Sequence, residues 1–159
     1  MKSRLEAESG ASLPGTAATI LEQKGRRVHA IGPDASVYEA VVKMAEHEVG
    51  ALFVMDDARL VGVISERDYA RKVILQGRSS RGTRVREVMT SPVIYVELTT
   101  PLADCMRIVS HEHVRHLPVL EQGRMIGVIS IGDLVQSIVA HQAETIEQLS
   151  TLLTGPYPA

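Results

Sequence analysis

Residues 62–68 read Gly-Val-Ile-Ser-Glu-Arg-Asp, and residues 127–133 read Gly-Val-Ile-Ser-Ile-Gly-Asp. Both segments belong to longer matching stretches, since a shift of 65 positions aligns 49–68 with 114–133 without a gap. Nine of the 20 aligned positions are identical, whereas average residue frequencies would give about one or two. This agreement indicates that the chain contains the same motif twice.

Each copy contains the same predicted order of elements. A short apolar stretch comes first (28–31 and 93–96), followed by a helix in which apolar residues recur every three or four positions. Ser36 and Glu39 have the spacing of a capping box at the start of the first such helix. Two apolar runs around a polar turn then predict a β-hairpin, and a second helix begins at Ser65 or Ser130. The expected unit is β-α-β-β-α, which places the chain in the α/β (α+β) class.

The domain organisation follows from these elements and from the composition of the segments around them. We expect a disordered N-terminal segment (1–15), the first repeat (16–75), a linker rich in Gly, Ser and Arg (76–84), the second repeat (85–140), and a C-terminal helix and tail (141–159). Apolar residues at helical spacing between 133 and 153 predict a long terminal helix. Its apolar face has no obvious internal surface to cover, so we expect a dimer contact there.

Composition excludes several classes of protein. The 17 basic and 19 acidic residues give a net charge of −2, which does not fit a non-specific nucleic-acid binder. No apolar run reaches the roughly 20 residues that a membrane span needs. The N-terminus lacks the continuous apolar core of a secretory signal. The single cysteine, Cys105, excludes an intramolecular disulfide and fits a reducing compartment. We therefore expect a cytoplasmic protein.

The repeated Ser-x-x-Asp segment has two interpretations. A hydroxyl and a carboxylate in the first turn of a helix can bind the phosphate and the ribose hydroxyls of a nucleotide, where free N–H groups also favour anions. The same arrangement is also an ordinary helix cap, with Ser at the N-cap and Asp three residues later. Duplication alone does not separate the two interpretations, because a structural cap would be inherited in both copies.

Three sequence phrases together resemble the cystathionine-β-synthase (CBS) domain family. They are Leu-Val-Gly-Val-Ile-Ser-Glu-Arg-Asp at 60–68, Val-Arg-His-Leu-Pro-Val at 114–119, and Val-Met-Thr at 88–90. The resemblance covers about residues 19–140. It implies that two CBS motifs pack as an intramolecular pseudo-two-fold pair. It also implies that adenosine-containing ligands lie in clefts between the two sheets.

The resemblance also implies the residues of two sites. Asp68 and Asp133 would bind ribose hydroxyls, with Ser65 and Ser130 near the phosphates. The clefts of the family are built crosswise, so much of each wall comes from the other motif. For Asp68 the implied wall is Met89, Thr90, Ile94, Val114 and Arg115, with His116 and Arg67 near the phosphate. For Asp133 it is Lys24, His29, Val49, Gly50 and Ala51.

The two sites are expected to be unequal. Arg67, Arg115 and His116 form a cationic set suited to a phosphate. The aligned positions of the other site hold Gly132, Gly50 and Ala51, which leaves Lys24 as the nearest candidate cation. We therefore expect the Asp68 site to bind the more charged nucleotide, or to bind it more tightly.

Other candidate residues are weaker. The two histidines of His111-Glu112-His113 lie near a predicted helix end and lack a third ligand, so no metal site is predicted. Cys105 lies on an apolar helix face and is expected in the core.

The predicted function is a regulatory sensor of AMP, ADP, ATP or NAD(H), without enzymatic activity and without a catalytic cofactor. The sequence contains no Gly-rich phosphate loop followed by Lys and no nucleophile elbow. We expect a homodimer that acts on an unidentified protein partner, with neither a membrane nor a nucleic acid as partner. The alternative is an oligomeric interaction scaffold whose ligand sites are vestigial.

Overall fold

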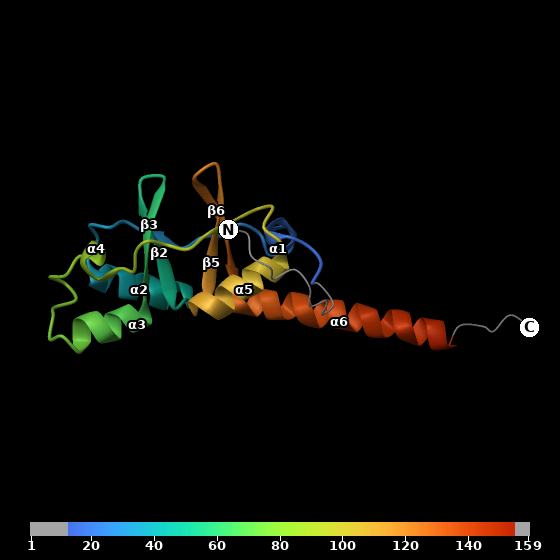
Figure 1. The fold of residues 1–159 in the computed structure, drawn as a ribbon. Helices are drawn as coiled ribbons and strands as arrows, with labels where there is room; N and C mark the ends of the chain where they lie inside the picture. Colours follow the sequence, from blue (N-terminus) through green and yellow to red (C-terminus); the bar gives the residue numbers. More distant parts are fainter. Residues whose placement is uncertain (1–12, 155–159) are drawn as a thin grey trace, which may run out of the picture. The chain divides into compact units, whose positions relative to one another are not determined.

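Both repeats have the predicted order of elements in the computed structural model, which describes residues 13–154 (Figure 1). The first repeat contains β1 (Ala30–Ile31), α2 (Val37–His47), β2 (Ala51–Asp56), β3 (Arg59–Ser65), α3 (Glu66–Tyr69) and the π-helical turn η1 (Ala70–Ile74). The second contains β4 (Val96–Glu97), α5 (Leu102–Glu112), β5 (His116–Glu121), β6 (Arg124–Ser130) and α6 (Ile131–Thr154). Each repeat begins with a short helix, namely α1 (Ala17–Lys24) and α4 (Val85–Val88). The segment expected to be disordered was 1–15, of which 1–12, like the tail at 155–159, lie outside the described residues. Within 13–15, the Gly15 carbonyl accepts a bond from the Leu102 N–H at 3.1 Å.

Each repeat forms its own three-stranded sheet. The orders are β1-β2-β3 and β4-β5-β6, with the first two strands of each sheet parallel. Ile31 pairs with Val54, and Val96 pairs with Val119. Since these two pairs are 65 positions apart, the duplication extends to the register of the strands.

The start of the first repeat's helix is capped as predicted. The Ser36 hydroxyl accepts a bond from the Glu39 N–H at 3.1 Å, and the Glu39 carboxylate accepts one from the Ser36 N–H at 3.1 Å. These reciprocal bonds satisfy two N–H groups that a helix leaves without partners at its first turn. They explain why α2 begins at Val37.

The chain forms two compact units whose boundaries differ from those of the repeats. Unit 1 comprises described residues 13–25, Leu98–Leu117 and 129–154, and unit 2 comprises Arg26–Glu97 and Pro118–Val128. The short helix that begins each repeat packs with the other repeat. In unit 2 the N–H of Val85, the first residue of α4, donates to the Ala35 carbonyl at 2.9 Å. In unit 1 the Ala17 N–H at the start of α1 donates to the Thr100 carbonyl at 2.9 Å.

The core of unit 2 consists of apolar residues from the predicted helices and strands. Val37, Ala40 and Met44 lie on one face of α2 and contact the buried side of β2 and β3. The other members are Leu52, Val54, Ile64, Val73, Val85 and Val88. In unit 1 Cys105 is fully buried, as predicted, and burial raises the pKa of its thiol.

Gly62 sets how closely the backbone of β3 approaches Met89. A Cβ added at Gly62 would lie 2.5 Å from the Met89 Sδ, 2.9 Å from its Cγ and 3.2 Å from its Cβ. We expect Gly62→Ala to cost about 1–3 kcal/mol of unfolding free energy, because overpacking forces neighbouring groups to move. Chemical denaturation measures this loss. The double variant with Met89→Ala should recover part of it, and no recovery would show that the clash with Met89 is not the cause.

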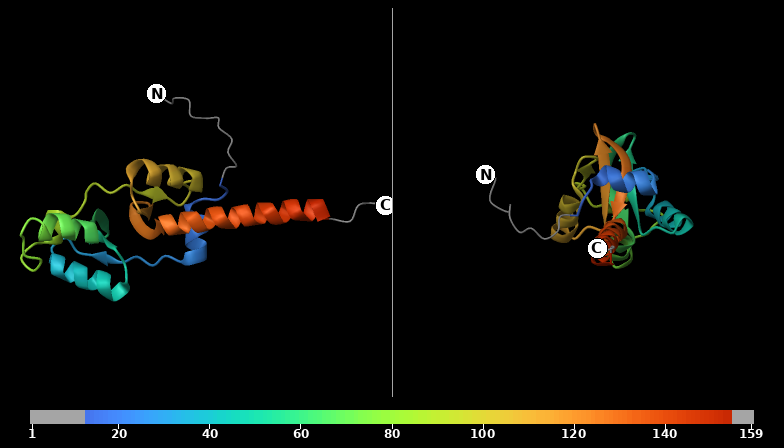
Figure 2. Two further views of the ribbon diagram at one scale, coloured as in Figure 1. Left: turned by 90° about the horizontal axis from the view of Figure 1, so that it is seen from below. Right: turned by 90° about the vertical axis from the view of Figure 1, so that its right-hand side faces the viewer.

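The terminal helix α6 is longer than any other helix between residues 13 and 154 (Figure 2). A long helix over 133–153 was predicted, and α6 spans Ile131–Thr154. Its apolar side chains become more exposed toward the C-terminus, from 48% at Val135 to 79% at Leu153. No helix in this part of the chain has both the length and the apolar content that crossing a bilayer requires.

Candidate ligand-binding site

Asp68 is held at the start of α3 by four donors. Its Oδ2 accepts bonds from the Ser65 N–H at 2.9 Å and from the Ser65 hydroxyl at 3.0 Å. Its Oδ1 lies 2.9 Å from the Lys72 Nζ and accepts a bond from the Thr90 hydroxyl at 3.3 Å. Asp68 is only 9% exposed. The carboxylate is therefore fixed in one orientation, with all four donors in unit 2.

Asp133 occupies the equivalent position at the start of α6 in unit 1. Its Oδ2 accepts a bond from the Ser130 N–H at 2.8 Å and lies 2.6 Å from the Lys24 Nζ. The Asp133 N–H in turn donates to the Ser130 hydroxyl at 3.1 Å. Both copies thus use Ser and Asp as a reciprocal cap, as the structural interpretation requires. Each carboxylate also forms an ion pair with a lysine, which a helix cap does not require.

Lys24, Asp133 and His116 form an electrostatic cluster in unit 1. Partial burial, the largest single influence, would raise the pKa of Asp133, but Lys24 and Ser130 together outweigh it and lower that pKa. The pKa of His116 is also lowered, first by loss of hydration around the ring and then by the positive charge of Lys24. Asp133 partly opposes this effect, and Arg115 adds to it. Lys24 therefore lowers the pKa of both neighbours, and Asp133 raises that of His116.

We expect the protein to lose stability below about pH 6.5 through His116. The folded-state pKa lies below the unfolded value of about 6.5, so the unfolded chain binds more protons in this window. One such group changes the unfolding free energy by at most about 1.4 kcal/mol per pH unit, and its contribution levels off below the folded pKa. Urea midpoints measured between about pH 5 and 7.5 should fall less steeply for His116→Asn than for the wild type. His29, whose pKa is lowered too, leaves a residual slope. Identical slopes in both proteins would contradict the assignment.

The ion pair of Lys24 and Asp133 lies in the wall of a cavity of about 410 Å³ in unit 1. Lys24 and Asp133 line it together with residues of α1, α5 and α6 and of the segment before α1. The other lining residues are Leu13, Pro14, Thr19, Ile20, Gln23, Leu102, Gln136, Ser137, Ala140, His141 and Glu144. This volume lies within the range typical of small-molecule sites.

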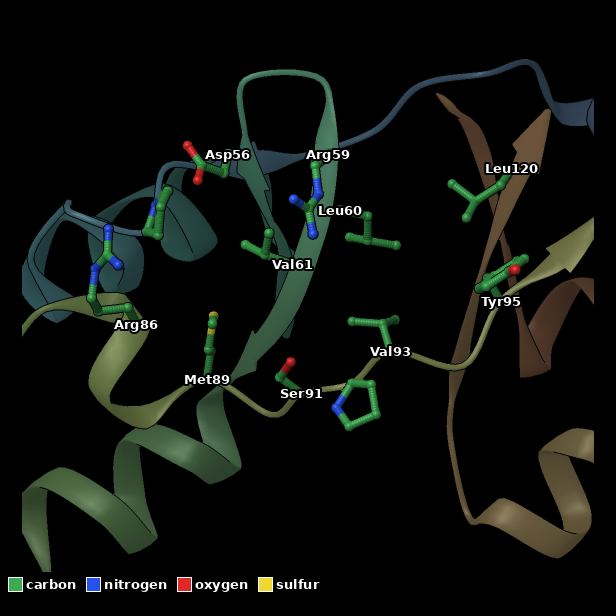
Figure 3. A pocket seen from close by; sticks show the side chains of 12 residues that line it. Asp56, Arg59, Leu60, Val61, Arg86, Met89, Ser91, Val93, Tyr95 and Leu120 are labelled. Carbon is green, nitrogen blue, oxygen red and sulfur yellow. The ribbon is translucent and has the colours of Figure 1, made fainter. Parts of the chain in front are cut away.

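A second cavity of about 480 Å³ lies in unit 2 (Figure 3). Its wall is mostly apolar, and Arg59 and Arg86 line it with Asp56 and Ser91. Met89 is the one member of the predicted site residues in this wall, and Asp68 is not part of it. The guanidinium of Arg86 is held by Asp34 at 2.7 Å. Sequence reasoning did not identify this cavity.

The structure brings some of the predicted site residues together within one unit. Thr90 contacts Asp68, and Lys24 contacts Asp133. Met89 packs on the core of unit 2, and Ile94 is 37% exposed. The Gly50 carbonyl accepts a bond from the first N–H of α3, and the Arg115 carbonyl accepts the equivalent bond at α6.

The remaining predicted residues are distributed over both units. Val49 packs on the core of unit 2, and Ala51 pairs with Ser65 across β2 and β3. The rings of His29 and His47 lie 4.4 Å apart. Arg67 is exposed in unit 2, whereas Val114 and His116 belong to unit 1. The assignment of walls across the two repeats stays a prediction.

Lys72 is the partner that sequence reasoning missed. It lies four positions after Asp68, a spacing that brings side chains together on a helical surface. This spacing was the available signal. Among residues 13–154 no three His, Cys, Asp or Glu side chains gather in a way that could hold a metal ion.

The comparisons with known proteins agree with this architecture. The family model for the CBS domain matches residues 25–74 and 85–140. The mitochondrial CBS domain-containing protein CBSX3 of Arabidopsis thaliana is 40% identical over 129 residues, covering 78% of this chain and 63% of its own length. A solved structure of a protein with CBS domains from Burkholderia ambifaria is 48% identical, with a TM-score of 0.75. It covers 80% of this chain and 96% of its own.

A third relative is CBSX2, whose crystal structure is a complex with AMP. It is 28% identical with a TM-score of 0.66, and it covers 81% of this chain and 99% of its own. The fold and the two carboxylate centres define a tandem-repeat α+β protein with one Ser-x-x-Asp centre in each copy. The chain belongs to the CBS domain family.

Proposed function

We propose that the chain is a regulatory sensor that binds adenine nucleotides at its Ser-x-x-Asp centres. The observation that carries this proposal is that the Asp68 and Asp133 carboxylates have the same two kinds of partner. Each is held by a Ser cap at a helix start and is paired with a lysine, at 2.9 Å for Asp68 and 2.6 Å for Asp133. A carboxylate can accept both hydroxyls of a ribose, and a nearby ammonium can bind a phosphate. The AMP complex of CBSX2 supports the ligand class.

The candidate ligands are AMP, ADP, ATP and NAD(H), and the proposed role is binding and regulation rather than catalysis. Binding would favour one state of the chain over another and so alter a partner protein. The expected cytoplasmic location stays a prediction, and CBSX3 is described as mitochondrial. A homodimer is also proposed. The exposed apolar side chains of α6 support it, and light scattering showing a monomer would contradict it.

A thermal-shift panel tests the nucleotide proposal directly. A nucleotide present at 100 times its dissociation constant should stabilise the folded chain by about 2.7 kcal/mol. AMP, ADP, ATP and NAD(H) are each compared with buffer at constant ionic strength, because salt alone weakens binding of a charged ligand. No shift with any of them would reject the sensor function and favour the scaffold alternative. A shift that persists when Asp68→Ala and Asp133→Ala are combined would place the site elsewhere.

A further inference from the structure

The carboxylate at Asp133 is neutralised by a lysine that comes from a distant part of the sequence. Lys24 ends α1, and its Nζ lies 2.6 Å from the Asp133 Oδ2 although the two residues are 109 positions apart. The side chains are 33% and 18% exposed. The Lys24 ammonium thus already binds the Asp133 Oδ2 atom, which a ribose hydroxyl would need as its acceptor.

The equivalent centre at Asp68 obtains its lysine in a different way. Lys72 follows Asp68 by four positions and also donates to the Val88 carbonyl at 2.9 Å. With the 65-position shift, Lys72 corresponds to Ser137, and Lys24 corresponds to Met89. The two copies therefore recruit their cations from non-equivalent positions. Lys24 therefore has no lysine counterpart at the aligned position of the other copy.

The Asp133 centre also has space beside the ion pair. Lys24 and Asp133 both line the cavity of about 410 Å³. Gln136, Ser137, His141 and Glu144 of α6 supply further polar groups to the same wall. The long, flexible stem of a lysine can therefore take a new position without leaving the cavity.

We propose that Lys24 is a displaceable counter-ion that makes the Asp133 centre selective for phosphorylated nucleotides over nucleosides. This inference rests on the proposed nucleotide-binding function. Without ligand, Lys24 pairs with Asp133. When ribose hydroxyls bind the carboxylate, the ammonium is released and pairs with the phosphate of the same ligand. A nucleoside offers no anion in exchange, so it must break the ion pair without replacement.

The test compares the affinities of AMP and adenosine by titration calorimetry. It uses the full chain carrying Asp68→Ala, so that only the Asp133 centre reports. We expect AMP to bind more tightly than adenosine. In Lys24→Met, which keeps the length of the stem but removes the charge, adenosine should bind more tightly than before. The ratio of the two affinities should fall about tenfold or more, since a hydrogen bond to a charged group is worth at least this factor.

Two further variants control this experiment. Lys24→Arg keeps the positive charge and should retain most of the selectivity. Arg124→Met removes a positive charge from an exposed position of β6, in unit 2, and should leave the ratio unchanged. If Asp68→Ala does not fold, the same ratios are measured in the otherwise wild-type chain. The change caused by Lys24→Met is then compared with that caused by Arg124→Met.

The outcomes separate this inference from the proposed function. An unchanged ratio in Lys24→Met, with AMP still bound, overturns the role of Lys24 and leaves nucleotide sensing intact. Absence of binding by both AMP and adenosine in the wild-type chain overturns the proposed function and this inference with it. If Lys24→Met binds adenosine more tightly and AMP more weakly than the chain with Lys24 does, the result supports both nucleotide sensing and the role of Lys24.

Discussion

Replacing Leu117 by alanine is expected to lower the unfolding free energy by about 2–5 kcal/mol. Leu117 lies in β5 and is fully buried. Truncation removes apolar contacts and leaves a cavity that the surrounding side chains fill only in part. Domains are commonly stable by only about 5–15 kcal/mol, so one substitution would remove a large share of the total. The equivalent change in the first repeat, Leu52→Ala, should have a similar effect, because Leu52 is also fully buried.

Urea denaturation followed by circular dichroism measures this loss. The matched control is Leu75→Ala directly after η1, where the side chain is 74% exposed and the expected change is within about 0.5 kcal/mol. If Leu117→Ala changed stability no more than Leu75→Ala, the packing of Leu117 described above would be wrong.

The second large effect is expected at Asp68. Asp68→Ala should cost about 2–3 kcal/mol, because it removes the acceptor of several charge-assisted hydrogen bonds and breaks a helix cap. Its donors, the Ser65 N–H and hydroxyl, the Thr90 hydroxyl and the Lys72 ammonium, all lose a partner. Ser65→Ala removes only the hydroxyl and should cost about 1 kcal/mol.

Asp133→Ala provides the internal comparison. Asp133 is more exposed than Asp68, with side-chain exposures of 18% and 12%. We therefore expect a smaller loss of unfolding free energy than for Asp68→Ala, measured under the same conditions. An equal or larger loss at Asp133 would show that the Lys24 ion pair contributes more to stability than its exposure suggests.

Much of the fold could be predicted from the sequence, because apolar periodicity and the duplication both report local structure. The capping box at Ser36 and the hairpins follow from residue types within a few positions of each other. The packing of α1 with the second repeat and of α4 with the first could not be predicted in this way. It depends on hydrogen bonds such as that between the Ala17 N–H and the Thr100 carbonyl, which join residues far apart in sequence.

In the candidate site, too, patterns within a few residues could be predicted, whereas most contacts between distant residues could not. The Ser-x-x-Asp segments were visible in the sequence, and the family resemblance placed Lys24 in the wall of the Asp133 site. The ion pair between Lys24 and Asp133 was not predicted. Lys72 was missed although its spacing was visible. The segment at 76–84 was assigned as a linker from its composition, which does not report hydrogen bonds. In the structure Thr83 is buried, and the Ser80 carbonyl accepts a bond from the Tyr38 N–H at 3.0 Å.

Unit 1 is built from three segments that are far apart in the sequence, and this affects its folding during synthesis. Its first segment, which includes α1, is synthesised well before α5 and α6, with which it shares the unit. Ribosomes add roughly 5–20 residues per second, so Lys24 waits roughly 5–20 s before Asp133, 109 residues later, exists. During that interval the apolar face of α1, with Ile20 and Leu21, has no native cover. The apolar face of α1 therefore stays without its native contacts until the residues of α5 and α6 have been synthesised.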